Sequence, residues 1–436
     1  MKKVERNTIW AKILYVFLLY CTIFSPPLAI MGRHLYFVWI VWPVSLLYLI
    51  NHRQHFHLFH KKFSNEFTLI YLIIFYSILR AALGGDLSIA FNNLMGLMSL
   101  IIVPFYFVGS GKKIGVVCVE GLTKYVLIAT SLAFASSILA LLIPSVDDYI
   151  RNVFIQYREG ELGNELKYRG FGLGSNMTSF FSFCIGMVVV FSFIYGKKEY
   201  WFKWLIPFAL IACVVNARTG VIVALVGILL YFVFSRNTKG FIVASVVGIL
   251  GYIYIFDILG LFLGGDTIEW VGVFLDQMEE MASGDTSEGG LDYFTQDMAI
   301  SPDSVLGWIF GEGVSTFGGI SIRGKYYFSD MGFVNQLFFG GIIYCSMLYI
   351  LILMIFIKLI KMHQRPFAYF MLAAFLIINF KGSFLFATPG FTLVLLFYYA
   401  VSVLGSTQHR YVPRIKMFNQ FDFKYEIIVC KYCIPC

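Results

Sequence analysis

Arg218 is the residue whose surroundings point most directly to chemistry. It lies in the short turn Asn216–Gly220, between two strongly apolar runs of the chain. The second run begins a predicted helix, so free backbone N–H groups and the positive end of the helix dipole lie beside the guanidinium. Because a guanidinium can make paired hydrogen bonds to phosphate, this turn predicts an anion-binding site. The alternative is an anchor whose side chain reaches the headgroups of a lipid layer.

Three further arginines are candidate anion ligands. Arg158 and Arg169 lie in a polar segment, residues 144–173, which leads into another predicted helix. The alternative for both is a solvated loop in which they balance neighbouring glutamates. Arg80 lies within an apolar run, where an arginine is expected to face the interior of a helix bundle or a water-filled cavity.

A second polar segment, residues 263–330, is rich in acidic residues, glycine and aromatic residues. Arg323 and Asp330 lie near its end, directly before an apolar run. A carboxylate in this position is a candidate general base or ligand of a sugar hydroxyl, and equally an N-cap of the following helix, a role for which Ser329 is the alternative. A long loop with a pattern of its own is usually functional.

The composition predicts the elements that position these residues. The 436-residue chain is 59% hydrophobic and 13% charged, with a mean hydropathy of +0.78, whereas soluble domains contain about 25% charged residues. These values exclude a soluble enzyme, a disordered chain and a nucleic-acid-binding protein. They predict an all-α polytopic integral membrane protein. About twelve transmembrane helices are expected, over residues 9–30, 34–50, 67–83, 89–108, 122–143, 174–195, 201–215, 219–235, 241–262, 331–357, 367–380 and 390–404.

The distribution of Lys and Arg predicts the orientation of the chain. With both termini in the cytoplasm, every cytoplasmic loop is basic, and the cytoplasmic segments hold most of the 33 Lys and Arg residues. The two long polar segments then lie on the outer side. The resulting division is 1–143 with helices one to five, 144–173 as the first large outer loop, 174–262 with helices six to nine, 263–330 as the second large outer loop, 331–404 with helices ten to twelve, and 405–436 as a basic cytoplasmic tail.

This layout resembles that of the Wzy-type O-antigen polymerases, in the O-antigen polymerase and ligase superfamily. The resemblance covers nearly the whole chain in its layout and is specific at three short stretches, Arg218–Gly220, Leu306–Gly313 and Ser329–Phe333. It implies a helical bundle like that of the GT-C membrane glycosyltransferases, with two large periplasmic loops, in the bacterial inner (cytoplasmic) membrane. It also implies an activity: polymerisation of O-antigen or capsule repeat units carried on undecaprenyl pyrophosphate. The growing glycan would be transferred to a sugar hydroxyl of the next lipid-linked unit, and undecaprenyl pyrophosphate would be released.

The resemblance also implies roles for the candidate residues. Arginines would neutralise the charge that grows on the leaving pyrophosphate, while aromatic residues and carboxylates would position sugars. Neither a cofactor nor a metal is expected. The expected partners are undecaprenyl-pyrophosphate-linked oligosaccharide and membrane lipids, without nucleic acid, and binding of a polysaccharide chain-length regulator is left open. The expected catalytic residues are Arg218, Arg169 and Asp330, and the expected substrate-binding residues are Arg158, Arg323, Arg80, Trp308 and Tyr326.

Two other functions are alternatives to the polymerase. An O-antigen ligase would use the same donor, but ligases of this layout carry a functional histidine in the large outer loop, and residues 144–330 contain no histidine. A flippase or transporter of lipid-linked sugars would place its charges inside the bundle and keep its loops short. The long segment 263–330 therefore favours the polymerase over the transporter.

Overall fold

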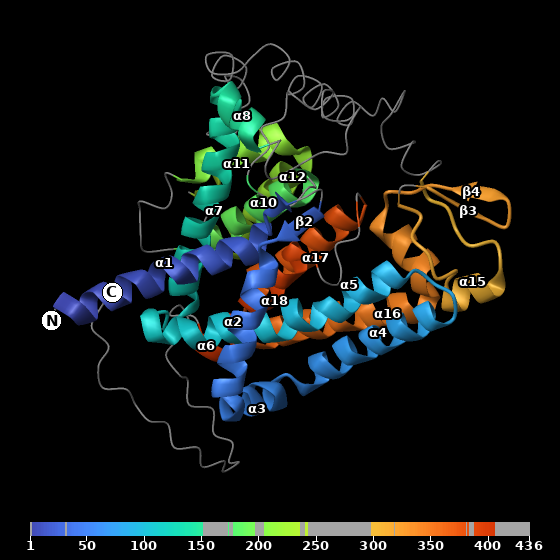
Figure 1. Ribbon diagram of the computed structural model, residues 1–436, viewed down its shortest axis with the longest axis horizontal. Helices are drawn as coiled ribbons and strands as arrows, with labels where there is room; N and C mark the ends of the chain where they lie inside the picture. The colour runs from blue at the N-terminus through green and yellow to red at the C-terminus, as the bar shows by residue number, and fades with distance from the viewer. Residues whose placement is uncertain are drawn as a thin grey trace.

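The computed structural model describes residues 2–30, 33–150, 173, 178–196, 205–235, 240–242, 298–317, 319–380, 382 and 388–405. This part of the chain is mostly α-helical and includes two short antiparallel hairpins (Figure 1). The prediction of a helical, membrane-embedded architecture is therefore confirmed at this level.

The helices precede, separate and follow the two hairpins along the chain. The hairpins are β1 (Pro27–Ile30) with β2 (Arg33–Tyr36) and β3 (Ile320–Ile322) with β4 (Lys325–Tyr327). The helices are α1 (Lys2–Phe24), α2 (Val38–Asn51), α3 (Arg53–Lys62), α4 (Ser64–Ala82), α5 (Leu87–Leu97), the π-helix η1 (Met98–Ile102), α6 (Val103–Gly111), the 3-10 helix η2 (Lys112–Ile114), α7 (Val119–Leu142), α8 (Pro144–Ile150), α10 (Thr178–Tyr195), α11 (Leu205–Asn216), α12 (Arg218–Ser235), α15 (Val305–Phe310), α16 (Gly332–Lys361), α17 (Arg365–Asn379) and α18 (Pro389–Leu404).

Four stretches of the described chain are long and apolar enough to cross a membrane by themselves, since a crossing helix needs about 20 residues. Shorter apolar helices occupy the other predicted runs, apart from 241–262, almost all of which lies outside the described residues. The total of twelve spans and the placement of the loops remain predictions. The four long stretches are Ser64–Ala82, Leu87–Ile114, Val119–Leu142 and Gly332–Lys361.

The first helix ends before the C-terminal end of its predicted span, 9–30. Helix α1 ends at Phe24, and Ser25 has a φ of 41°. Pro26 and Pro27 follow, and proline both lacks a backbone N–H and disfavours helical geometry in the residue before it. The rest of the predicted span, up to Ile30, forms strand β1 instead.

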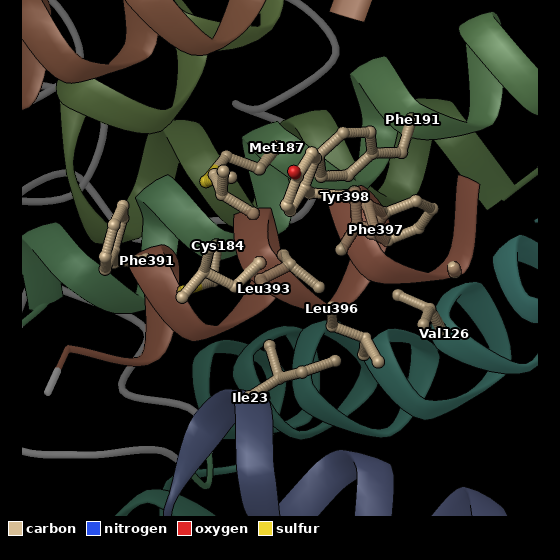
Figure 2. Packing of buried hydrophobic residues seen from close by; sticks show 14 of the residues in the cluster. Ile23, Val126, Cys184, Met187, Phe191, Phe391, Leu393, Leu396, Phe397 and Tyr398 are labelled. Atoms are coloured by element: carbon tan, nitrogen blue, oxygen red, sulfur yellow. The ribbon is translucent and has the colours of Figure 1, made fainter. Parts of the chain in front are cut away.

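Helix α18 lies at the centre of the hydrophobic core. Every residue from Gly390 to Val401 is buried, as expected for a helix that is apolar around its whole circumference. In Figure 2, side chains of α18 pack among side chains from α1, α7 and α10. The rings of Phe397 and Phe191 stack with centroids 3.9 Å apart and an interplanar angle of 12°.

Helices α4, α5 and α16 run side by side and form a second group (Figure 1). Helix α15 and the β3–β4 hairpin lie together at one end of this group, where α4 ends and α16 begins. This end contains the described part of the second polar segment, and it is where several candidate residues meet.

Candidate functional site

Helix α16 is interrupted at Gly341. This residue has φ 64° and ψ −166°, a combination that is essentially restricted to glycine. A Cβ atom on Gly341 would lie 2.3 Å from the Ile309 carbonyl oxygen, so the close approach also requires glycine. The apolar run 331–357 predicts one continuous span. The adjacent pair Gly340 and Gly341 is the signal that could have revealed the break.

The loop after α15 caps the first half of the broken helix. The backbone N–H of Glu312 donates to the Phe338 carbonyl over 2.6 Å, and the N–H of Gly313 lies 3.1 Å from the carbonyls of Phe338 and Phe339. Carbonyl groups at the end of a helix lack partners within the helix. The loop therefore supplies hydrogen bonds that the break removes.

Arg80 and Tyr76 of α4 hold this loop. Arg80 Nη2 donates to the Gly311 carbonyl over 2.9 Å, and the Tyr76 hydroxyl lies 3.0 Å from the Phe310 carbonyl and 2.9 Å from the Gly340 carbonyl. The Arg80 Nε atom is buried and has no hydrogen-bond partner among the described residues. The predicted candidate Arg80 is thus placed against the Leu306–Gly313 stretch, while sequence reasoning missed Tyr76 because nothing marks it among the many aromatic residues.

A buried polar group lies beside this junction. Asn93 of α5 donates through Nδ2 to the Ser77 hydroxyl over 2.7 Å and to the Tyr344 hydroxyl over 3.0 Å. All three side chains are buried, and they come from α5, α4 and α16 respectively. Buried polar groups that are hydrogen-bonded fix the relative positions of the elements carrying them. These three helices therefore form a defined support for the loop.

A small pocket of about 70 Å³ lies between the loop, the β3–β4 hairpin and α16. Charged and aromatic side chains of the hairpin face two acidic residues across it, Asp303 before α15 and Glu312 after it. Its lining residues are Pro302, Asp303, Glu312, Ile322, Arg323, Lys325, Tyr327 and Phe338.

Asp303 is the centre of one polar cluster in this pocket. Lys325 Nζ donates to Asp303 Oδ1 over 2.9 Å, and the Tyr327 hydroxyl donates to Asp303 Oδ2. The hydrogen bond from Tyr327, followed by that from Lys325, lowers the pKa of the Asp303 carboxyl. The same carboxylate raises the pKa of Lys325 and of Tyr327, mainly through these hydrogen bonds. Asp303 and Tyr327 were not among the predicted site residues.

Glu312 is the centre of the other cluster. Arg323 Nη2 lies 3.4 Å from Glu312 Oε2, and the Ser304 hydroxyl donates to Glu312 Oε1 over 3.3 Å. The Glu312 side chain is 14% exposed, whereas that of Arg323 is 70% exposed, so Arg323 can reach a ligand in solvent. Arg323 lies in the hairpin turn with φ 52°.

The two predicted aromatic ligands lie on different elements of the same segment. Trp308 is on α15 with 41% of its surface exposed, and Tyr326 is on β4 with 67% exposed. Both rings are accessible to a ligand. Their placement brings them into one folded segment with Arg323.

Asp330 does not occupy the N-cap position of α16. The N-cap residue is Met331, which makes no side-chain capping bond. Ser329, the alternative, is not the N-cap residue either: its hydroxyl accepts a 3.2 Å hydrogen bond from the N–H of Met331, which precedes the helix. The N-cap interpretation of Asp330 is therefore wrong, because the helix begins one residue later than that interpretation requires. Its interpretation as a general base remains a prediction.

Arg218 is the first residue of α12, so the helix begins one residue earlier than the predicted span 219–235, and Arg218 lies in its first turn instead of in the preceding turn. The side chain of Arg218 lies outside the described part of the structure. The neighbouring Gly220 has a clear packing role: a Cβ atom there would lie 2.2 Å from the Ser182 carbonyl oxygen of α10. The Ser182 hydroxyl also lies within hydrogen-bond distance, 2.6 Å, of the Ala217 carbonyl. Arg158 and Arg169 lie outside the described residues.

The helices and this junction define the chain as a helical membrane protein with a folded polar segment packed on one end of α4, α5 and α16. Comparison with known proteins adds no family: no protein-family model matches the sequence, and a search of curated proteins finds no match.

Proposed function

We propose that this protein is a polymerase of undecaprenyl-pyrophosphate-linked O-antigen or capsule repeat units, acting at the periplasmic face of the bacterial inner membrane with both termini in the cytoplasm. One observation carries the proposal: Arg80 joins the end of a membrane span to a folded segment that has a charged pocket and accessible aromatic side chains. These features match a lipid-linked glycan, which has a pyrophosphate at the membrane surface and sugars beyond it.

The reaction needs a cation at the pyrophosphate and ligands for sugars. A hydroxyl of one lipid-linked unit attacks the anomeric carbon of the growing chain, the bond from that carbon to the pyrophosphate oxygen breaks, and the hydroxyl proton passes to a base, for which Asp330 is the candidate. Arginines stabilise the charge that develops on the leaving pyrophosphate. The candidates for this role are Arg218, Arg169, Arg158, Arg80 and Arg323.

The sugar-binding part of the proposal rests on the 298–331 segment. Trp308 and Tyr326 present exposed rings, against which the apolar faces of sugars can stack. Asp303 and Glu312 present carboxylates to the pocket. The proposal uses neither a nucleotide nor a metal ion. Chain growth in membranes supplied only with lipid-linked repeat units is therefore expected to continue in the presence of EDTA.

A gel of surface polysaccharide from a strain that lacks the gene tests the function. A lipid core carrying a single repeat unit is the expected result. Bare core with accumulated lipid-linked polymer would replace the proposal with a ligase, and bare core without polymer would replace it with a flippase or transporter.

A further inference from the structure

Helix α15 exposes an unusual amount of apolar surface for a segment outside the long helices. Five of its six residues are large and apolar, and their exposed fractions range from 38% at Ile309 to 75% at Val305. Only Gly307 of this helix is buried. Contiguous apolar patches of this kind are rare on surfaces that face water, and they mark sites that contact a protein or a membrane.

The contacts of α15 place it alongside a membrane span. Its last residue, Phe310, receives a hydrogen bond through its carbonyl from Tyr76, and the next residue is bonded to Arg80. Tyr76 lies six residues before the end of α4 at Ala82, which is roughly 9 Å along a helix. Helical side chains also lean toward the N-terminus, so the Tyr76 hydroxyl lies still farther from that end. The end of α15 therefore lies at the depth of the span.

The elements that contact the loop after α15 also expose apolar side chains. The turn between α4 and α5 contacts the loop after α15, because the Asp86 N–H donates to the Gly313 carbonyl over 2.7 Å. Leu83 in this turn is 69% exposed, Leu87 at the start of α5 is 75% exposed, and Phe75 of α4 is 66% exposed. Side chains of this type on a spanning helix face lipid. Lipid is therefore also the expected neighbour of the exposed apolar side chains of α15.

The β3–β4 hairpin has the opposite character. The side chains of Arg323 and Lys325 are 70% and 62% exposed, and Asp303, which Lys325 contacts, is 56% exposed. Such charges need water, since a charged side chain in the bilayer interior costs at least about 2.5 kcal/mol. The 298–331 segment thus exposes an apolar part at α15 and a charged part at the β3–β4 hairpin.

We propose that α15 is embedded in the bilayer, where its side chains contact lipid acyl chains, while the β3–β4 hairpin stays in water. Backbone at membrane depth must be satisfied by protein, and the bonds of the 310–313 loop to Tyr76, Arg80 and α16 meet this requirement. The inference depends on the membrane-embedded fold alone. It places the Trp308 ring in lipid and leaves Tyr326 of the hairpin as the aromatic sugar ligand, while the rest of the polymerase proposal is independent of it.

Photo-crosslinking from matched positions tests this placement. A diazirine amino acid replaces either Leu306 or Tyr326 in the full-length protein, reconstituted in phosphatidylcholine nanodiscs. These two side chains are 68% and 67% exposed, so simple exposure does not distinguish them. After illumination, intact-protein mass spectrometry is expected to show a phospholipid adduct for position 306 at several times the yield for position 326. Equal lipid yields, or crosslinks from 306 to protein, would overturn the proposal.

Tryptophan quenching provides a second measurement that needs no unnatural residue. Brominated phosphatidylcholine quenches tryptophans that contact acyl chains. The Trp308→Phe variant is expected to lose part of the bromolipid-quenched fluorescence while its iodide-quenched fluorescence is unchanged. An unchanged bromolipid-quenched signal with a reduced iodide-quenched signal would place Trp308 in water and contradict the embedding of α15.

Discussion

Glu66 and Lys358 form an ion pair between the first turn of α4 and the last turn of α16, with Nζ 2.7 Å and 2.9 Å from the two carboxylate oxygens. The Glu66 side chain is fully buried, and the Tyr398 hydroxyl of α18 also donates to it. Tyr76 and Arg80 join α4 to α16 and its loop at the other end of the same helix. Helix α4 is thus fixed to its neighbours by polar contacts at both ends.

The ion pair predicts an asymmetric effect of mutation on stability. Lys358→Met leaves the buried carboxylate of Glu66 without its cation, and we expect a loss of about 3 kcal/mol, since removing one partner of a buried pair is costly. Replacing both residues, as Glu66→Gln with Lys358→Met, is expected to recover most of this loss. Thermal unfolding in detergent measures the stability of the single and of the double variant. Lys361→Met, an exposed change in the same turn, is the matched control. A Lys358→Met variant as stable as this control would contradict the prediction.

The break in α16 predicts that Gly341 cannot be replaced. Gly341→Ala places a Cβ atom against the Ile309 carbonyl in a backbone conformation that only glycine adopts readily, and we expect a loss of about 3 kcal/mol or more. Gly324→Ala is the control, because Gly324 also has a positive φ, 81°, but its Cβ would meet nothing within 4 Å. Its expected loss is about 1 kcal/mol. Comparable thermal stabilities for the two variants would show that the contact at Gly341 is unimportant.

The Asp303 cluster predicts that the hairpin loosens in acid. Asp303 has a lowered pKa in the folded protein, so its bonds stabilise the hairpin fully at neutral pH. This contribution is lost below the ordinary carboxyl range, as the pH falls through the lowered pKa. Pepsin digestion of the protein in nanodiscs at a series of acid pH values should show cleavage at residues 320–327 rising as the pH falls.

Asp303→Asn is the control for the acid prediction. An amide does not titrate in this range, so the variant is expected to lose the pH dependence and to be cleaved readily throughout. A wild-type protein whose hairpin resists pepsin equally at every pH would contradict the role given to Asp303.

Arg218 is the sharpest test of the proposed catalytic site. If it holds pyrophosphate beside the first turn of α12, Arg218→Ala should lower the polymerisation rate by roughly 10²–10³. The product should then be mostly single-repeat glycan. Arg218→Lys keeps the charge but loses the planar fork, so shorter chains are expected. If Arg218 is only an anchor at the lipid headgroups, its replacement would lower the amount of the protein in the membrane. Immunoblotting of the membrane fraction measures this amount and so distinguishes the two roles. Full-length polymer from Arg218→Ala protein at normal abundance would remove Arg218 from the site.

The proposed orientation predicts the side on which each loop lies. Reporter fusions at Asn164 and Ser287 should report the outer compartment, and fusions at Lys112 and Thr238 the cytoplasm. The physical reason is that basic loops are retained in the cytoplasm during insertion. A cytoplasmic signal at Ser287 would place the 263–330 segment on the wrong side for lipid-linked substrates.

Much of the architecture follows from local sequence. A membrane-embedded helix must satisfy its own backbone hydrogen bonds and present apolar side chains, and both are properties of one continuous stretch. The apolar runs therefore predict where α4, α7 and α18 lie, and the position of Arg80 near the end of such a run marks it as a candidate. Proline pairs and glycine pairs, as at Pro26 and Gly340, modify the helices in ways that are also local.

Only the tertiary structure decides which of these elements meet. The Tyr76 hydroxyl and the Phe310 carbonyl are 234 residues apart in the chain, and Glu66 and Lys358 are 292 apart. No periodicity links such positions, because their proximity depends on how the helices pack against one another. The sequence by itself determined a helical membrane protein with arginines near its polar segments. Packing decided that the loop after α15 fills the break in α16, because the carbonyls exposed there need donors that a separate segment supplies.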